Sequence, residues 1–510
     1  MIFQSSDITK PLRESADVCI IGSGCGGGAA AKILAEAGKK VIVLEEGGYY
    51  TAKDFDSTEA TAYQNLYQRR AGQATDDLSI TILQGRSVGG SSTVNWTTTL
   101  RTPEFVLDAW VKRGVRDLSS KDLDPYFGRI ERYLNVHTEP EEFHNPNNRI
   151  ILDGARALGY HTQANGRNTK DCVRSGACGL GCPFDAKLSV NITYIPDAEK
   201  AGATVFSDCR AERISLHGPQ KRVSGFVLDR LTGKAKTDFI IEAPVVIISG
   251  SAINSPVLLL KSELANSSGE VGKHLTLHPT SAVVGLFERV IYPAGGIPQS
   301  AMCDEFLNKN NDDGGFWVEA VPVYPVLAAL ALPGFGKAHH ETMRLFPHLG
   351  ASIVLVKETD SEGQVTVNDA GRPSVSYDLG DRDRQYLQQA LGVAAKIHFA
   401  AGARKVMTLH SLRTEMKNSD EVAQALENAD WSPNEFNLYS AHPLGSCRMG
   451  EDPNSSVVNS RCQTHDVKGL FVIDGSVMPT SLGVNPQMTI LAIAEKSAEW
   501  VADNFAQLSG

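Results

Sequence analysis

The segment DVCIIGSGCGGGAAAKILAEAGKKVIVLEE, residues 17–46, constrains the fold more than any other part of the chain. It begins with a short apolar run, Val18–Ile21, which is typical of a buried parallel strand. A glycine-rich turn follows, and then an alanine-rich stretch that favours a helix and ends at Gly38. A second apolar run, Val41–Leu44, ends in two glutamates. This order of strand, glycine turn, helix, strand and acid predicts a dinucleotide-binding unit.

The glycines of this turn each have a physical role. Gly22 permits the tight turn after the strand, Gly24 lets backbone N–H groups approach a pyrophosphate, and Gly27 lets the helix pack close to the sheet. The positive end of the helix dipole then faces the phosphates. Glu45 can accept hydrogen bonds from ribose hydroxyls and would repel a 2′-phosphate, which favours FAD or NAD over NADP. A glycine turn without a ligand is the alternative, but the complete set of elements around it favours the nucleotide site.

Length and composition exclude several classes of protein. A chain of 510 residues is expected to form about two to four domains. Its net charge of −10 gives no basic footprint for nucleic acid. No apolar run reaches the roughly 18 residues of a membrane-spanning helix, and the first residues lack the apolar core of a secretory signal. Nine cysteines without a regular framework are typical of a reducing compartment. We therefore expect a cytoplasmic protein with no nucleic-acid partner, and peripheral membrane contact stays open.

A second glycine-rich stretch, QGRSVGGSSTVNW, spans residues 84–96. So many small residues are expensive in conformational entropy, so we expect that a ligand requires them. Small residues let the backbone lie flat against a planar ligand, with N–H groups and hydroxyls free to bond to it. A flexible surface loop is the alternative, but Arg86, Asn95 and Trp96 are unusual in a linker. The stretch therefore predicts a loop that covers a ligand.

The two glycine-rich stretches together resemble those of the glucose–methanol–choline (GMC) oxidoreductases, a family that binds FAD. In that family the first motif holds the ADP half, and a later G-R-x-x-G-G-S-S-x-x-N stretch lies along the isoalloxazine; residues 85–95 match it. The resemblance adds cofactor contacts from Arg86, Gly89, Gly90, Ser91 and Asn95 to those of the first turn. Some members attach the flavin through a His just before that Asn. Val94 stands there in this chain, so non-covalent FAD is implied.

The resemblance also implies an α/β fold, in which a Rossmann-type FAD-binding domain joins a second, α+β substrate domain built on an antiparallel sheet. We assign residues 1–275 to the first domain, 276–440 to the second, and 441–510 to the return into the first. Family analogy places the backbone at Ala211 near the adenine. The sequence GSAINSPVLLL, starting at residue 250, matches a second family signature, and we expect His278, after it, to be structural. The apolar stretch 321–335 is predicted to be core, with a substrate tunnel or a membrane-facing surface as alternatives.

Three cysteines fall within the segment 171–187, at Cys172, Cys178 and Cys182. Buried structural thiols are the first interpretation. An iron–sulfur or other metal site is the second, because clustered thiolates followed by a proline are typical of such loops, although no fourth cysteine is near. A disulfide suits the expected compartment poorly. Within the family the segment resembles both the long-chain alcohol oxidase and dehydrogenase branch and the sugar dehydrogenases that carry an iron–sulfur cluster.

The catalytic stretch begins with His442, in the small-residue segment SAHPLGSCRMG. In the family the matching His faces the flavin N5 and the substrate hydroxyl, and a His or Asn about 40 residues later is its partner; here that residue is Asn485. Asp474 and Gly475 match a second pyrophosphate contact. The helix after Pro486 is implied to point its N-terminus at the flavin, with cofactor contacts from Gln487 and Met488.

The implied reaction is FAD-dependent oxidation of a hydrophobic alcohol to an aldehyde or ketone by hydride transfer to flavin N5. His442 would act as the base or hold the alkoxide, and oxygen, a quinone or an electron-acceptor protein would take the electrons. The alternatives are an iron–sulfur sugar or polyol dehydrogenase, a lyase or decarboxylase on the same fold, and a non-catalytic subunit.

Overall fold

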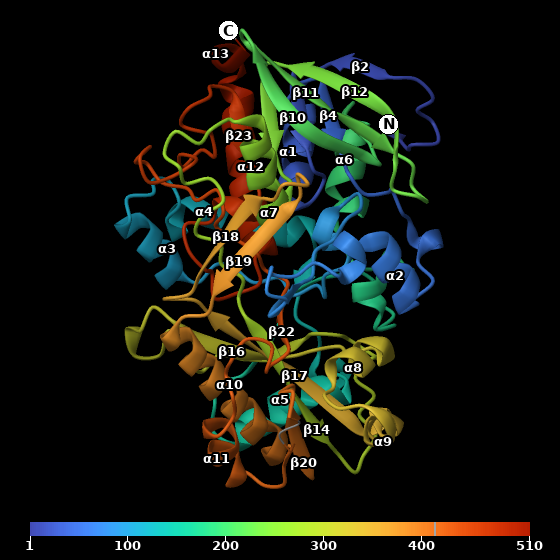
Figure 1. Ribbon diagram of the computed structural model, residues 1–510, viewed down its shortest axis with the longest axis vertical. Coiled ribbons are helices and arrows are strands. Elements are labelled where there is room, and N and C mark those ends of the chain that lie inside the picture. Colours follow the sequence, from blue (N-terminus) through green and yellow to red (C-terminus); the bar gives the residue numbers. More distant parts are fainter. Residues whose placement is uncertain (413–414, 510) are drawn as a thin grey trace.

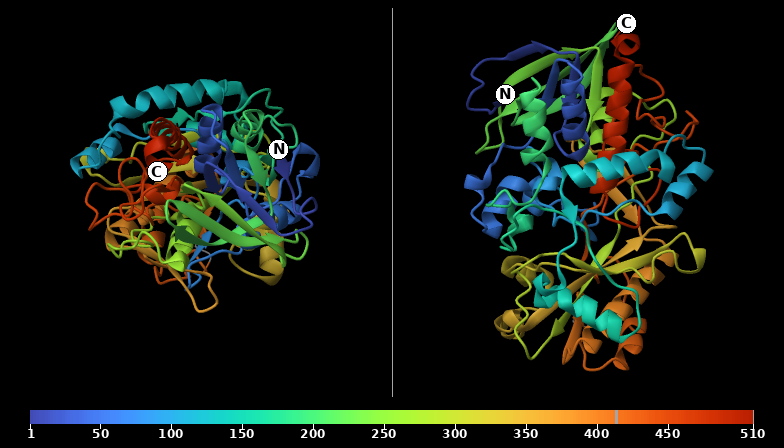
Figure 2. Two further views of the ribbon diagram at one scale, coloured as in Figure 1. Left: turned by 90° about the horizontal axis from the view of Figure 1, so that it is seen from above. Right: turned by 180° about the vertical axis from the view of Figure 1, so that it is seen from behind.

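The computed structural model describes residues 1–412 and 415–509. Figure 1 shows two lobes stacked along the longest axis, with both chain ends in the upper lobe. The views in Figure 2 place α12 (Gln487–Asp503) beside α1 (Cys25–Glu36) in that lobe, and these two helices pack together. The described part of the chain contains no helix with the length and apolar character needed to cross a bilayer.

A parallel sheet forms the centre of the upper lobe, with the strand order β1-β9-β4-β3-β13-β23. Its strands are Ile2–Phe3, Thr204–Phe206, Val41–Leu44, Val18–Ile21, Val245–Ile248 and Leu470–Val472, in that order. Every residue of β3, β4 and β13 is buried, as expected where the strands of a parallel sheet are covered on both faces. Helix α1 also packs on α6 (Tyr194–Lys200). The two strands predicted from the first motif are confirmed at their predicted bounds.

A smaller sheet of order β10-β11-β12-β2 lies beside the parallel sheet. Its strands are Cys209–His217, Gln220–Leu228, Ala235–Ala243 and Leu12–Ser15. Helix α7 (Ser251–Ser262) packs against β10 and carries the GSAINSPVLLL signature. Other helices of this lobe are α2 (Glu59–Leu66), α3 (Glu104–Lys112), α4 (Ser120–Tyr133) and α13 (Phe505–Ser509).

The lower lobe is built on a largely antiparallel sheet of order β21-β20-β14-β17-β16-β15-β7, with β22 paired to β14 and β5 paired to β22. Its strands are Glu415–Met416, Lys405–Thr408, Thr280–Leu286, Leu349–Lys357, Gly315–Ala320, Ala301–Cys303, Gln163–Ala164, Leu438–Ser440 and Ile80–Ile82. Helices α5 (Pro146–Ala157) and α10 (Asp381–Ala400) pack on this sheet. The remaining helices of the lobe are α8 (Pro325–Ala331), α9 (Gly336–Arg344) and α11 (Glu421–Glu427).

Alternating side chains give this sheet two different faces. In β17, Val354 and Val356 pack into the core formed with α5 and α10. Ala351, Ile353 and Leu355 of the same strand point to the opposite face. One face is therefore closed by helices, and the other is free to wall a cavity.

The lower lobe takes elements from beyond residues 276–440. Strands β5 and β7 and helix α5 come from the first part of the chain and join its sheet or its core. Conversely, a hairpin from within residues 276–440 packs on the upper lobe: β18 (Glu362–Val367) and β19 (Pro373–Asp378) contact α7. The division at residues 275 and 440 stays a prediction, and the chain crosses between the lobes more often than that division implies.

The contact of α1 with the parallel sheet leads to the first testable prediction. A Cβ on Gly26 would lie 1.9 Å from the carbonyl oxygen of Ile473, whereas a Cβ on Gly24 would have its nearest neighbour 3.8 Å away. Gly26→Ala is therefore expected to destabilise the fold by about 1–3 kcal/mol, as overpacking does, and to lower the urea midpoint of the flavin-free protein. Gly24→Ala is the matched control and should change that midpoint much less. Equal midpoints for the two variants would contradict this account of the helix–sheet contact.

Candidate active site

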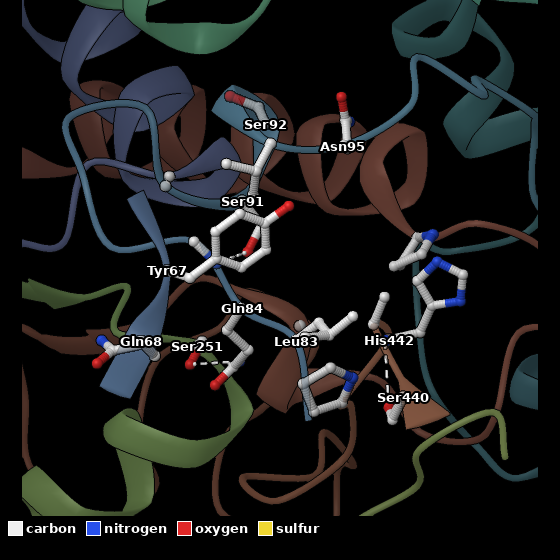
Figure 3. Close-up of a pocket in the computed structure, with 18 of the residues that line it drawn as sticks. Tyr67, Gln68, Leu83, Gln84, Ser91, Ser92, Asn95, Ser251, Ser440 and His442 are labelled. Carbon is white, nitrogen blue, oxygen red and sulfur yellow. Dashed lines mark hydrogen bonds between the residues drawn. The ribbon is translucent and has the colours of Figure 1, made fainter. Parts of the chain in front are cut away.

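A cavity of about 400 Å³ extends from the glycine turn of the upper lobe to the open face of the lower sheet. Figure 3 shows side chains from several segments around this hollow, among them Tyr67, Gln84, Asn95 and His442. Gln84 donates through Nε2 to Ser251 Oγ at 3.0 Å, which joins the second glycine-rich stretch to the start of α7. The cavity thus lies between the segments that the sequence singles out.

The first glycine turn forms one end of the cavity. Gly22 and Gly24 line it, whereas Gly27 does not. Gly22 has a φ of +101°, and a Cβ there would lie 2.1 Å from the carbonyl oxygen of Ser249. A Cβ on Gly27 would lie 1.9 Å from the carbonyl oxygen of Gly22. Gly27 therefore allows close packing of the helix on the turn, and Gly22 and Gly24 present backbone to a ligand.

Glu45 lies on the cavity wall, but its carboxylate already has partners. It accepts from the Ser23 amide at 3.0 Å, the Ser23 hydroxyl at 2.6 Å and the Gly47 amide at 2.8 Å. Burial raises the pKa of this carboxyl. The next residue, Glu46, also lines the cavity and forms an ion pair with Arg86, from Oε1 to Nε at 3.3 Å. Arg86 does not line the cavity, so its place is behind Glu46 and not against a ligand.

The two glycine-rich stretches meet through their backbones. A Cβ on Gly90, which has a φ of +56°, would lie 2.8 Å from the Cα of Gly24. Gly90, Ser91 and Asn95 line the cavity. Gly89 lies behind it, and its amide donates to Ser23 Oγ at 3.1 Å.

The C-terminal segment closes the same cavity. Asp474, Gly475 and Gln487 line it, as does Ala211 from β10. Asp474 accepts from the Ser251 amide at 2.8 Å and the Ser476 amide at 2.7 Å, so it fixes the starts of two turns. The Gln487 amide oxygen accepts from Asn95 Nδ2. Met488 is fully buried and does not line the cavity.

His442 and Asn485 lie on the wall where the glycine end meets the lower sheet. Burial lowers the pKa of His442 to about 4, so its imidazole is neutral at pH 7. The Asn485 Oδ1 atom is buried without a hydrogen-bond partner. The two predicted catalytic residues therefore share one part of the cavity, with polar atoms left for a ligand.

Two further residues of this site were missed by the sequence analysis. His278 is fully buried, and its Nδ1 lies 3.1 Å from Nδ1 of His442, so it is not the merely structural residue that we expected. Glu319 of β16 is fully buried and lines the cavity, and burial raises its pKa to about 8. An acid within the apolar strand FWVEAV is a signal that could have drawn attention to Glu319. No local signal marks His278.

An apolar chamber occupies the far end of the cavity, against the open face of the lower sheet. Its wall comes from β14, β17 and α8 and from neighbouring loops, with Val284, Val321, Val323, Leu327, Ala328, Leu332, Phe346, Ala351, Ile353, Leu409 and Tyr439. The segment 321–335 therefore supplies a cavity wall in addition to core. Of the interpretations given for this segment, the one in which it lines a cavity fits the structure, because α8 turns one side to the chamber while Leu330 is 73% exposed.

The three clustered cysteines surround a separate small void. Cys178 is buried, Cys172 and Cys182 are half-buried, and all three thiols are free. In the described ranges 1–412 and 415–509, no three His, Cys, Asp or Glu side chains are grouped so that they could hold a metal ion. Lys187 donates to the carbonyl oxygens of Thr93 at 2.6 Å and Cys178 at 2.7 Å. These bonds anchor the cysteine segment to the second glycine-rich stretch, which is a structural role.

Comparison with known proteins identifies the family. Two family models, each described as GMC oxidoreductase, match residues 26–280 and 359–494. Long-chain-alcohol oxidase FAO4B of Arabidopsis thaliana is 30% identical over 517 residues, which cover 96% of this chain and 68% of that protein. An uncharacterized GMC-type oxidoreductase of Mycobacterium tuberculosis is 32% identical over 493 residues, which cover 95% and 75%.

A solved structure agrees with this result. A variant of the formate oxidase of Aspergillus oryzae, studied for its effect on FAD modification, has a TM-score of 0.72 at 16% identity and covers 97% of this chain and 99% of that chain. An identity this low bears on the fold alone, and it confirms the predicted fold class. On the matched segments and these relatives, the chain belongs to the GMC oxidoreductase family.

Proposed function

We propose that this protein oxidises a hydrophobic alcohol to the aldehyde or ketone with non-covalently bound FAD. One observation carries the proposal: a single cavity joins a glycine-lined nucleotide end to an apolar chamber, with His442 and Asn485 at the junction. The named relative, a long-chain-alcohol oxidase, acts on substrates that would suit such a chamber.

The residues of the cavity fit a dinucleotide with a flat polar ring. The slot is lined by glycine backbone at Gly22, Gly24 and Gly90, so no side chains stand between a ligand and the backbone there. Three polar atoms along it, Gln84 Oε1, Trp96 Nε1 and Asn485 Oδ1, are buried without partners, and ring heteroatoms would satisfy them. The Glu45 carboxylate would exchange its hydrogen bonds with Ser23 for bonds with the ribose hydroxyls. Val94 offers no nucleophile for covalent attachment.

In this proposal the side chains orient the alcohol and the flavin supplies the redox chemistry by accepting a hydride. His442 and Asn485 hydrogen-bond the carbinol oxygen and hold the carbinol carbon toward the cofactor end of the cavity. The chamber excludes water and binds the hydrocarbon chain. Helix α12 begins at Gln487 on the cavity wall, and its N-terminus places partial positive charge there. Oxygen is the proposed electron acceptor, because the relative is an oxidase.

The direct test is the absorption spectrum of the purified protein during anaerobic titration with alcohols. We expect flavin bands that bleach with long-chain alcohols and recover with hydrogen peroxide formation when air is admitted. Recovery only with a quinone or an acceptor protein would make the protein a dehydrogenase. Flavin that no alcohol bleaches would favour the lyase class, and absence of flavin would refute the proposal.

Removal of the His442 side chain tests its contact with the reacting oxygen. His442→Ala is expected to lower the rate of flavin reduction by about 10²–10³-fold, as loss of a preorganised hydrogen-bond partner does, while FAD stays bound. Rapid-mixing absorbance gives the rate, and the flavin-to-protein ratio gives cofactor content. Near-normal reduction in this variant would refute the role of His442.

The size of the chamber predicts a chain-length effect. Ala351 lines the chamber, so Ala351→Phe should displace about three methylenes of a long alcohol, at roughly 0.8 kcal/mol each. We expect kcat/KM for a long-chain alcohol to fall on the order of 50-fold, with little change for a short alcohol in the same variant. An equal loss for both alcohols would show that the chain does not bind along Ala351.

A further inference from the structure

The ring of His278 has a defined tautomer. Its Nε2 lies 3.1 Å from the amide nitrogen of Leu482 and 3.3 Å from that of Gly483. Backbone amides only donate, so Nε2 must accept and carries no proton. Burial, with His442 and Lys357 nearby, holds the pKa of His278 well below its usual range, so the ring is neutral. Its single proton is therefore on Nδ1.

This proton determines the tautomer of His442. Nδ1 of His278 is 3.1 Å from Nδ1 of His442, and the two rings are nearly perpendicular at 87°. Nδ1 of His442 must accept this hydrogen bond, so the proton of the neutral His442 ring is on Nε2. His442 then offers an N–H to a ligand and has no lone pair at Nε2 to receive a hydroxyl proton.

A different proton acceptor lies on the same wall. Glu319 of β16 lines the cavity, and the next residue along the chain that lines it is the apolar Val321. Trp317 contacts the ring of His278, with centroids 5.4 Å apart, and Glu319 follows two residues along the strand, roughly 7 Å away. Glu319 is fully buried, and its Oε2 has no hydrogen-bond partner. A buried carboxyl oxygen without a partner is costly unless the site uses it.

The surroundings of Glu319 are uncharged. Asn165 Nδ2 donates to its Oε1 at 3.3 Å, and Met302 and Ile353 flank it on β15 and β17. The other titratable groups near this wall are the two neutral histidines, Glu358, which accepts from the His278 amide at 2.9 Å, and Lys357, whose amine donates to the Asp313 carbonyl oxygen at 2.7 Å. Burial raises the pKa of Glu319 to about 8, against the lowering effect of the neighbouring Asn485, Trp317 and Asn165 side chains.

We propose that His278 fixes His442 as a hydrogen-bond donor to the carbinol oxygen, and that the Glu319 carboxylate accepts the hydroxyl proton, directly or across one water molecule. The inference rests on the proposed alcohol oxidation. The alcohol O–H bond breaks and an O–H bond forms on Glu319, while the carbinol C–H electron pair leaves as hydride to the flavin and the carbon becomes a carbonyl carbon. His278 is a positioning residue, and Glu319 is catalytic.

The tautomer is tested without turnover, by NMR of the flavin-bound protein with ¹⁵N-labelled histidine. Comparison with His442→Gln assigns the His442 signals. We expect the proton of His442 on Nε2, and a proton on Nδ1 would overturn the proposal. His278→Gly removes the ring and its donor, and glycine tolerates the left-handed backbone at residue 278, where φ is +47°. In this variant His442 should populate both tautomers; an unchanged Nε2–H would remove the role of His278.

The role of Glu319 is tested by the pH dependence of flavin reduction. Only the ionised carboxylate accepts a proton, so the wild-type rate should rise with pH through about 8 and then level off. Glu319→Gln should lower the rate of flavin reduction by more than about 10²-fold and abolish its rise with pH. The control Glu288→Gln, at an exposed residue, should keep the wild-type rate and pH profile. A Glu319→Gln variant with the wild-type rate and pH profile would overturn the proposal.

Two controls keep the outcomes separate. Infrared difference spectra between pH 6 and pH 10 should show a protonated carboxyl band in the wild type that Glu319→Gln lacks; this readout needs no substrate, and its absence would overturn the assignment. Glu319→Asp, which keeps a carboxylate, should retain a pH-dependent rate. If no alcohol reduces the wild-type flavin, the proposed function fails, whereas the tautomer of His442 is still decided by NMR.

Discussion

The close approach of α1 to the ends of the parallel strands sets the geometry of the whole site. At Gly26 the helix touches the carbonyl oxygen of Ile473, and at Gly27 it touches that of Gly22, at distances that leave no room for a side chain. Ile473 is followed by Asp474, which holds the starts of α7 and of the next turn through their amides. The glycine turn, Asp474 and the segment leading to Asn485 are therefore positioned by one set of backbone contacts.

The lower lobe supplies the second half of the cavity by a different means. Its sheet is closed on one face by α5 and α10, and the alternation of side chains along β17 turns Leu349, Ala351, Ile353 and Leu355 to the cavity. Most of those side chains are aliphatic, which gives binding energy for hydrocarbon without directional bonds. Directional bonds are confined to the junction with the upper lobe, where His442, Asn485 and Glu319 lie. The division of the cavity into polar and apolar parts follows from which lobe supplies each wall.

Local patterns predicted much of this arrangement. The strands of the first motif are confirmed, and Ser91, Asn95, His442 and Asn485 line one cavity, as their motifs indicated. The roles of His278 and Glu319 could not be predicted in this way. The partners of His278 at Leu482 and Gly483 are more than 200 residues away, and they meet it only when the lobes pack. For Arg86 the predicted cofactor contact stays a prediction, because the motif could not indicate that Glu46, from a separate segment, forms an ion pair with it.

The two neutral histidines suit a cavity that excludes water. A carboxylate behind His442 would stabilise its imidazolium form and raise its pKa, but the buried carboxylate in this region, Glu358, accepts from the backbone amide of His278 at 2.9 Å and not from an imidazole. Both rings therefore stay uncharged, and their protons are fixed by backbone amides that do not move. A donor fixed before substrate arrives costs no reorganisation when charge develops on the carbinol oxygen, and in a low-dielectric cavity its stabilising effect is larger than in water. The proton itself then requires a separate acceptor whose pKa is near the working pH. The buried carboxyl of Glu319 has such a pKa, and a histidine with a pKa of about 4 does not.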